Sequence, residues 1–116
     1  MTNPKKSKSS VNVGIDVGKS VLDVCIHEKQ IHWQDKNSPE GIKRIIKRLC
    51  HYRVVRIVME ATGRYEFELE QAAYEKGLPV CIVKPLRIRR YAQSMELLAK
   101  TDKLDAILIA GFAAAG

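Results

Sequence analysis

The chain has 116 residues, of which 46% are hydrophobic and 28% are charged. This length and composition predict one folded domain and argue against a mainly disordered chain. Lysine and arginine number 20 against 13 acidic residues, and the net charge of +7 favours a polyanionic partner such as DNA or RNA. Three cysteines lie far apart in the sequence. They give no support to a disulfide framework or a zinc ribbon, and they fit a reducing cytoplasm.

The N-terminal segment 1–10 contains three lysines, three serines and a proline, which predicts a flexible basic tail. No segment has the run of about 18 apolar residues that a membrane helix needs, and no signal-peptide pattern follows the N-terminal lysines. We therefore expect a cytoplasmic protein whose folded domain occupies 11–116.

Alternating apolar and polar residues predict strands at 11–17, 21–27 and 30–35, which form an antiparallel meander. A helix is predicted at 39–50, with Ser38 as its N-cap and Pro39 at its first position. The remaining predicted elements are buried strands at 54–59 and 80–83, and helices at 65–76, after Pro85, and from Asp102 toward Phe112. The order β-β-β-α-β-α-β-α-α predicts an α/β fold, a ribonuclease-H-like mixed sheet with helices on its faces.

Four carboxylates stand where the predicted strands end or the helices begin. Asp16 lies on the polar side of the first strand and Glu60 ends the fourth, while Asp102 and Asp105 lie three residues apart on the last helix. Strands one and four are neighbours in this topology, so the four side chains can converge. Carboxylates without His or Cys partners select Mg²⁺ or Mn²⁺, and two such ions support phosphoryl transfer on nucleic acid.

Each carboxylate also has a purely structural explanation. An acid at the start of a helix commonly caps it or favours its positive end, and that role alone would account for Asp102. Asp16 is harder to explain in this way, because an acid within a run of Val and Ile disfavours a strand.

Three segments carry a resemblance to a known family: GIDVGK at 14–19, EATGRYE at 60–66 and KTDKLDA at 100–106. In this order and spacing they resemble the signature segments of Piv-type DNA invertases and insertion-sequence transposases of the IS110 group. The resemblance implies a RuvC-like fold and metal-dependent DNA strand cleavage and exchange in transposition and recombination. Asp16, Glu60, Asp102 and Asp105 would be the catalytic, metal-binding residues.

Members of this family are longer and carry a C-terminal domain with a nucleophilic serine, which has no counterpart in these 116 residues. The resemblance therefore implies that this chain is the N-terminal catalytic domain, which we do not expect to perform the full reaction alone. It also implies DNA as substrate and a homo-oligomer for the full-length protein. Some relatives use a structured noncoding RNA as guide, which would suit the positive charge.

Basic side chains near these segments are candidates for nucleic-acid contacts. Arg64 could hold a phosphate near Glu60, or pair with Glu66 or Glu68 instead. Tyr91 fits better as a residue that packs inward with Ile88 than as one that stacks on a base. The candidate nucleic-acid-binding residues are Lys19, Arg64, Arg87, Arg89 and Arg90.

Three alternatives stay open. A Holliday-junction-type nuclease on the same fold would carry the same acids. A non-catalytic nucleic-acid-binding module would bind without metal, so Mg²⁺ or Mn²⁺ would leave its thermal stability unchanged. A fragment of a sugar-kinase or actin-like ATPase would need a second glycine-rich phosphate loop and an adenosine site, and the sequence contains neither.

Overall fold

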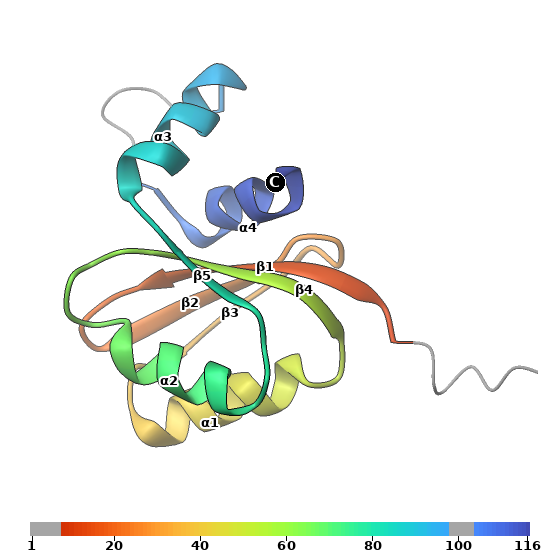
Figure 1. The fold of residues 1–116 in the computed structure, drawn as a ribbon, viewed down its shortest axis with the longest axis vertical. Helices are drawn as coiled ribbons and strands as arrows, with labels where there is room; N and C mark the ends of the chain where they lie inside the picture. The colour runs from red at the N-terminus through yellow and green to blue at the C-terminus, as the bar shows by residue number, and fades with distance from the viewer. Residues whose placement is uncertain (1–7, 98–103) are drawn as a thin grey trace, which may run out of the picture.

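The structure of the chain is a computed structural model that describes residues 8–97 and 104–116. The described strands are β1 (Ser10–Val17), β2 (Val21–Ile26), β3 (Ile31–Lys36), β4 (Arg53–Glu60) and β5 (Val80–Val83). The described helices are α1 (Pro39–Leu49), α2 (Phe67–Glu75), α3 (Pro85–Ser94) and α4 (Ala106–Ala115). They follow one another in the predicted order, and the α/β fold class is confirmed (Figure 1).

The five strands form one mixed sheet in the order β3-β2-β1-β4-β5. β1 pairs antiparallel with β2, and β2 pairs antiparallel with β3, as the predicted meander requires. On its other side β1 pairs parallel with β4, which in turn pairs parallel with β5. The predicted neighbourhood of the first and fourth strands is therefore confirmed, and the ends of β1 and β4 lie at the same edge of the sheet.

Helices cover both faces of the sheet, with α1 and α2 on one side and α3 and α4 on the other (Figure 1). The period-two pattern of β1 sorts its residues between these layers. Val13 and Ile15 are fully buried in the cluster that includes the apolar side chains of α1 and α2. Gly14 and Asp16 therefore face α4, and the polar side of β1 is the side on which a site can form.

Local signals explain why α1 begins where it does. Ser38 has an extended backbone, and its side-chain oxygen accepts a hydrogen bond from the Gly41 N–H at 3.1 Å. Ile42, Ile45 and Ile46 then face the sheet, and burying each such side chain stabilises the fold by about 1.5–3 kcal/mol. The predicted helix at 39–50 is thus confirmed to within one residue.

Three predicted elements need correction. β1 begins at Ser10 and not at residue 11 as predicted. Arg53 N–H donates to the Ser9 carbonyl at 2.9 Å, so this hydrogen bond holds the end of the predicted tail against the start of β4. β4 and β5 are buried only in part: Val55 is exposed, and Val83 is the buried residue of β5. β5 lies at the edge of the sheet, where one side of the strand has no neighbouring strand among the residues that the structure describes. Apolar strand residues alone do not distinguish a central strand from an edge strand.

The last helix also differs from the prediction. α4 begins at Ala106, and Asp105 precedes it as N-cap with extended backbone angles, φ −128° and ψ 174°. The predicted start at Asp102 lies outside the described residues. In the described part of the chain, no helix has the length and apolar character needed to cross a membrane.

Candidate functional site

Asp16 and Glu60 lie on neighbouring strands and on the same face of the sheet. The parallel register of β1 and β4 pairs Gly14 with Val58 and Ile15 with Met59, so Asp16 and Glu60 are the next residues along the two strands. Val58 packs in the cluster formed with α3 and α4, and the alternation of β4 puts Glu60 on that side too. The structure therefore brings these two predicted residues together at the carboxyl ends of their strands.

The pKa of the Glu60 carboxyl responds to burial and to two charged neighbours. Burial raises the pKa of the Glu60 carboxyl, and the negative charge of Asp16 raises it further. The positive charge of Arg89 on α3 acts in the opposite direction and lowers the pKa of Glu60. Asp16, Glu60 and Arg89 thus form one interacting charge group.

Asp105 approaches the same face of the sheet from the start of α4. Its carboxylate oxygen Oδ1 accepts a hydrogen bond from the Leu108 N–H at 2.9 Å, as an N-cap does. Its negative charge adds to burial in raising the pKa of the Cys25 thiol on β2. The prediction that Asp102 and Asp105 share a helix face is wrong for Asp105, because the capping bond keeps this residue outside the helix. Asp102 lies outside the described residues.

Asp23 is an acidic residue of this face that was not predicted. It is the direct cross-strand partner of Asp16 in the antiparallel β1–β2 pair, so both carboxylates project from the same side of the sheet. His32 Nε2 lies 3.6 Å from Asp23 Oδ1. The sequence signal was available: Asp23 interrupts an apolar strand just as Asp16 does, and such an acid is unfavourable in a strand without a partner or a function.

The fit of a divalent ion depends on the donors that this face offers. Within residues 8–97 and 104–116, no three Asp, Glu, His or Cys side chains are grouped closely enough to hold one ion. Asp16 and Glu60 nevertheless supply a pair of oxygen donors whose mutual repulsion a cation would relieve. These two carboxylates are oxygen donors of the kind that hard divalent cations prefer, and they are fewer than a complete set of ligands.

The loop between β4 and α2 follows Glu60 directly and carries the candidate Arg64. Glu66 is only 3% exposed and accepts hydrogen bonds from the Thr62 hydroxyl and from the Gly63 and Arg64 N–H groups, the latter two at 3.2 Å each. The Glu66 carboxylate thus contacts Arg64 at the backbone N–H of Arg64. The guanidinium group of Arg64 lies 6.0 Å from the centre of the Tyr65 ring. Both Arg64 and Lys19, in the turn after β1, are exposed at the edge of the sheet where Asp16 and Glu60 lie.

The three candidate arginines of α3 divide into two groups. Arg89 interacts with Glu60, as described above. Arg87 and Arg90 instead line a hollow of about 470 Å³ at the end of β5, together with Lys84. This hollow is near the carboxylates, because Val83 pairs with Glu60 across β4 and β5. Lys84 was not among the predicted residues. Tyr91 packs edge-on against Phe112 with ring centres 5.5 Å apart, so its predicted inward position is confirmed.

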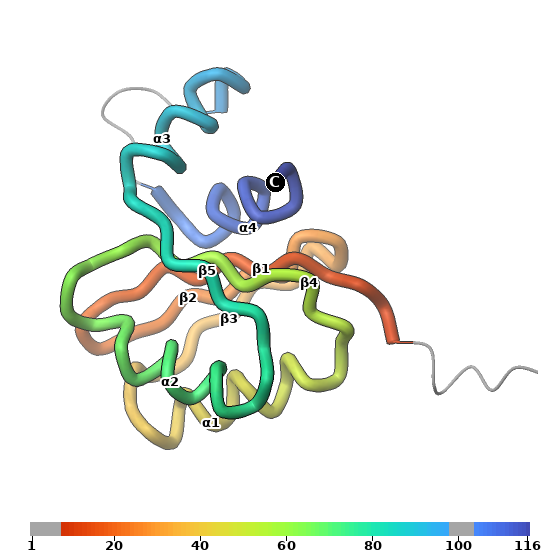
Figure 2. Tube along the Cα trace, viewed as in Figure 1, coloured from red at the N-terminus to blue at the C-terminus, as the bar shows by residue number. Residues whose placement is uncertain are grey.

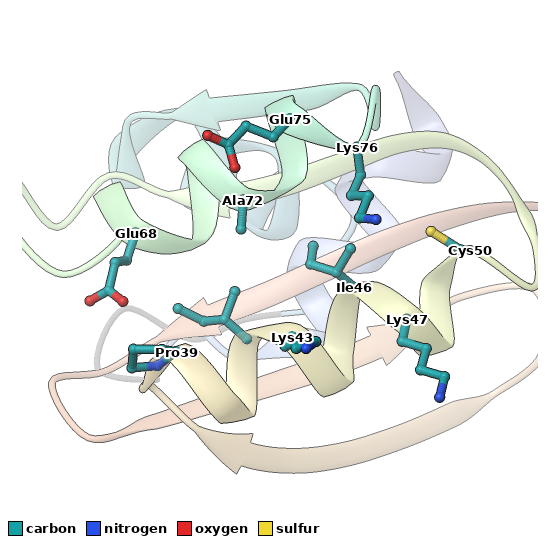
Figure 3. A pocket seen from close by; sticks show the side chains of 10 residues that line it. Pro39, Lys43, Ile46, Lys47, Cys50, Glu68, Ala72, Glu75 and Lys76 are labelled. Atoms are coloured by element: carbon teal, nitrogen blue, oxygen red, sulfur yellow. The ribbon is translucent and has the colours of Figure 1, made fainter.

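A groove on the opposite face of the sheet lies between α1 and α2. It has a volume of about 630 Å³, and its rim carries Lys43, Lys47 and Lys76 around Ile46 and Ala72 (Figure 3). The carboxylates face α3 and α4, so this groove does not belong to the candidate site.

Two other cations of α1 are engaged with β3. Arg44 donates two hydrogen bonds to Asp35, at 2.9 and 2.7 Å, and this pair lowers the pKa of the Asp35 carboxyl to about 2. Arg48 lies 4.0 Å from the centre of the Trp33 ring. These contacts favour a structural role for this part of the basic surface of α1.

Comparisons with known proteins indicate the family to which this chain belongs. A family profile described as a transposase, of the DEDD type of IS110 elements, matches residues 13–116. The pilin gene-inverting proteins of Moraxella bovis and Moraxella lacunata are each 34% identical to this chain over 113 residues. Each alignment covers 91% of this chain and 35% of the relative, so the chain spans about a third of the length of these relatives.

A solved structure shares the fold. The RuvC structure of Thermus thermophilus matches with a TM-score of 0.56 and 17% sequence identity, over 90% of this chain and 89% of that one. At this identity the likeness concerns the fold, and it confirms the predicted RuvC-like architecture. The three signature segments, the RuvC-like sheet and the family match over 13–116 agree, and the chain belongs to the IS110 family of DEDD transposases.

Proposed function

We propose that this chain is the metal-dependent catalytic domain of a DNA transposase or site-specific recombinase. The observation that carries the proposal is the Asp16–Glu60 pair on adjacent parallel strands, where the negative charge of Asp16 raises the pKa of the Glu60 carboxyl. A transposase family and a RuvC-like fold make DNA the substrate that suits this pair. The net charge of +7 suits the same substrate.

Asp16 and Glu60 would hold a Mg²⁺ or Mn²⁺ ion through carboxylate oxygens. Asp105 and Asp102 are the other ligands that the family resemblance implies. Oδ1 of Asp105 caps α4, and a carboxylate has a second oxygen that can serve an ion. When bound, divalent ions would activate an attacking hydroxyl or water and stabilise the leaving oxygen of the DNA phosphate. Arg89 favours the ionised, metal-binding form of Glu60, since its charge lowers the pKa of that carboxyl.

The DNA backbone would lie across the α3 side of the sheet. Lys84, Arg87 and Arg90 gather beside the end of β5, next to the strand that carries Glu60. Such a group contacts phosphates and positions the duplex without reading its sequence. Lys19 and Arg64 would add phosphate contacts at the edge of the sheet where Asp16 and Glu60 lie.

The family resemblance also suggests activities and partners of the full-length protein. The relatives that this chain matches are about three times as long. Strand exchange by the full-length protein, its self-association and its use of a structured guide RNA are therefore proposals from the family resemblance. The geometry of the described residues supports only the proposals of metal binding and DNA binding.

Titration of the 116-residue chain with Mn²⁺, followed by calorimetry and by thermal unfolding, tests the metal site. We expect Mn²⁺ to bind and to raise the unfolding midpoint of the wild-type chain. Asp16→Asn and Glu60→Gln should each weaken Mn²⁺ binding at least about tenfold. The matched control is Glu75→Gln, which removes one negative charge from exposed Glu75 on α2, on the other face of the sheet.

Equal Mn²⁺ affinities for the wild type and the two site variants would contradict the assignment of these carboxylates. If Mn²⁺ leaves the unfolding midpoint of the wild-type chain unchanged, the result would instead support a nucleic-acid-binding module without a metal site.

A further inference from the structure

The paired register of β1 and β4 ends just before the residues that matter most. The last pair is Ile15 with Met59, and Asp16 and Glu60 follow it. Beyond that pair, Asp16 is paired with Asp23 of β2 and Glu60 is paired with Val83 of β5. A contact between the segments that follow Asp16 and Glu60 would hold these two strand ends at a fixed separation.

Asn37 makes that contact. Its side-chain Nδ2 donates one hydrogen bond to the Gly18 carbonyl at 2.8 Å and another to the Tyr65 carbonyl at 3.0 Å. Gly18 lies two residues after Asp16, and Tyr65 lies five residues after Glu60. An amide NH₂ group has two N–H donors, and here the two acceptors belong to the two loops that extend the carboxylate-bearing strands. We call this pair of bonds the Asn37 bridge.

Each loop is held in a definite shape where Asn37 contacts it. On one side, Gly18 N–H donates to the Val21 carbonyl at 2.9 Å and closes the β1–β2 turn. On the other side, the buried Glu66 carboxylate accepts hydrogen bonds from the Thr62 hydroxyl and from two backbone N–H groups. Thr62 Oγ1 in turn accepts a hydrogen bond from the Tyr65 N–H at 2.8 Å. Both loops lie at the same edge of the sheet (Figure 2). The two hydrogen bonds from Asn37, one to each loop, connect them.

Asn37 is itself anchored. Its backbone N–H donates to the Ser20 carbonyl at 2.9 Å, and it immediately precedes Ser38, the N-cap of α1. α1 packs through its isoleucines on the core, so the amide is presented from a rigid element. A residue that is held this firmly can position the groups it contacts.

We propose that Asn37 is a positioning residue, which sets the separation of Asp16 and Glu60 by bridging the loops that follow them. The inference rests on the proposed function for its consequence, which is that this separation suits one divalent ion. It predicts that loss of the two N–H donors loosens the loops relative to each other and weakens the ion's binding, while the core stays folded.

The first measurement is independent of metal. Nitroxide labels at Lys19→Cys and Arg64→Cys, in a chain where exposed Cys50 and Cys81 are replaced by serine, report the distance between the two loops by dipolar EPR. We expect a narrow distance distribution with Asn37 present and a broad one in Asn37→Asp. That variant keeps the shape of the side chain but replaces both N–H donors by an acceptor.

The second measurement is Mn²⁺ affinity by calorimetry, in the unlabelled chain. We expect Asn37→Asp and Asn37→Ala to weaken Mn²⁺ binding about tenfold or more, the range seen when support of a metal ligand is lost. The matched control is Asn12→Ala, which removes a 2.6 Å bond from Asn12 Nδ2 to Glu28 near the opposite end of β1. This control should lose stability without losing Mn²⁺ affinity.

The outcomes separate the inference from the proposed function. An unchanged distance distribution in Asn37→Asp overturns the inference, whatever the metal result. A broadened distribution with wild-type Mn²⁺ affinity overturns it too, provided that Asp16→Asn weakens binding at least about tenfold, as proposed above. A wild-type chain that binds no Mn²⁺ overturns the proposed function, and the spin-label distances still show whether Asn37 holds the loops together.

Discussion

At the scale of single residues, Asp16 and Glu60 show how two neighbouring carboxylates affect the stability of the fold. Each carboxylate is part of a strand whose other residues are mostly apolar, and each lies beside the charge of the other. Burial disfavours the ionised form of Glu60, and repulsion from Asp16 disfavours it further. Without a cation, therefore, the folded chain is less stable at neutral pH than one with neutral side chains there.

The pH dependence of this penalty can be predicted from the sign of the shift. The folded state raises the pKa of Glu60, so folded protein binds that proton more tightly than unfolded protein does. Stability contributed by the protonated form is therefore present at acidic pH and is lost as pH rises through the raised pKa. Solvent screens this partly exposed carboxyl, so we expect Glu60→Gln to be more stable than wild type at pH 7 in metal-free buffer by only on the order of 1 kcal/mol.

Thermal unfolding of both proteins between about pH 4 and pH 7 measures this difference. It should grow with pH, reach a few degrees at neutral pH, and shrink when Mn²⁺ stabilises the wild type. Glu75→Gln is again the matched control and should show no such growth. A stability difference that stays constant across this pH range would mean that the Glu60 carboxyl has its ordinary pKa.

At the scale of elements, the position of α4 depends on one residue without a side chain. A Cβ built on Gly14 would lie 2.7 Å from the Ala106 carbonyl oxygen and from the Ala110 Cα, and closer still to the Ala110 nitrogen. α4 thus rests directly on the backbone of β1. Ala106 and Ala110 also pack on Cys25 of β2, which is buried. This close approach brings Asp105, at the start of α4, to the face of the sheet that carries Asp16.

We expect Gly14→Ala to push α4 away from the sheet and to destabilise the fold by about 1–3 kcal/mol or more. The buried Cys25 thiol should then become accessible to a thiol reagent, as we expect the exposed thiols of Cys50 and Cys81 to be in the wild type. The matched control is Gly111→Ala in α4, where the added methyl group meets the Tyr91 hydroxyl at an ordinary 3.6 Å.

Gly111→Ala should keep Cys25 protected and should stabilise the helix by about 0.5–1 kcal/mol. Thiol labelling and thermal unfolding of the two variants provide the comparison. Protection of Cys25 in Gly14→Ala would show that α4 does not need this close contact.

At the scale of the whole molecule, the two faces of the sheet carry basic groups with different surroundings. Lys84, Arg87 and Arg90 lie on the side of the carboxylates. Lys43, Lys47 and Lys76 surround the groove between α1 and α2 on the other side (Figure 3). The net charge of the chain cannot distinguish the two surfaces, because each group of three contributes equally to the 20 basic residues.

DNA binding over a salt series distinguishes the two faces. Each phosphate contact contributes about −0.9 to the slope of log K against log salt on duplex DNA. Replacing Lys84, Arg87 and Arg90 by glutamine should therefore flatten the slope by about 2.7 and weaken binding about equally for all sequences. Fluorescence anisotropy with a labelled duplex measures both quantities.

The matched control replaces Lys43, Lys47 and Lys76 by glutamine, which lowers the net charge by the same three units. Its slope should stay close to that of the wild type. Equal flattening in both variants would mean that DNA responds to the total charge and that the α3 side is not the binding surface.

Much of this architecture is readable from local patterns in the chain. Period-two alternation separates the buried face of β1 from the face that carries Asp16, and Ser38 with Pro39 marks the start of α1. These signals act over a few residues, since they depend on strand pleat, helical pitch and capping bonds. The element order, the ribonuclease-H-like class and the anomaly of an acid in the first strand could therefore be predicted from these local patterns, whereas the RuvC-like class came from the family resemblance.

Other features depend on contacts between distant parts of the chain. The amide of Asn37 reaches carbonyls 19 and 28 residues away, and no local pattern specifies that pairing. Arg89 and Arg90 are adjacent in sequence, yet the packing of α3 sends one to Glu60 and the other to the hollow beside β5. β5 is an edge strand because of the order in which the sheet assembles. Such placements follow from long-range packing, which local periodicity does not encode.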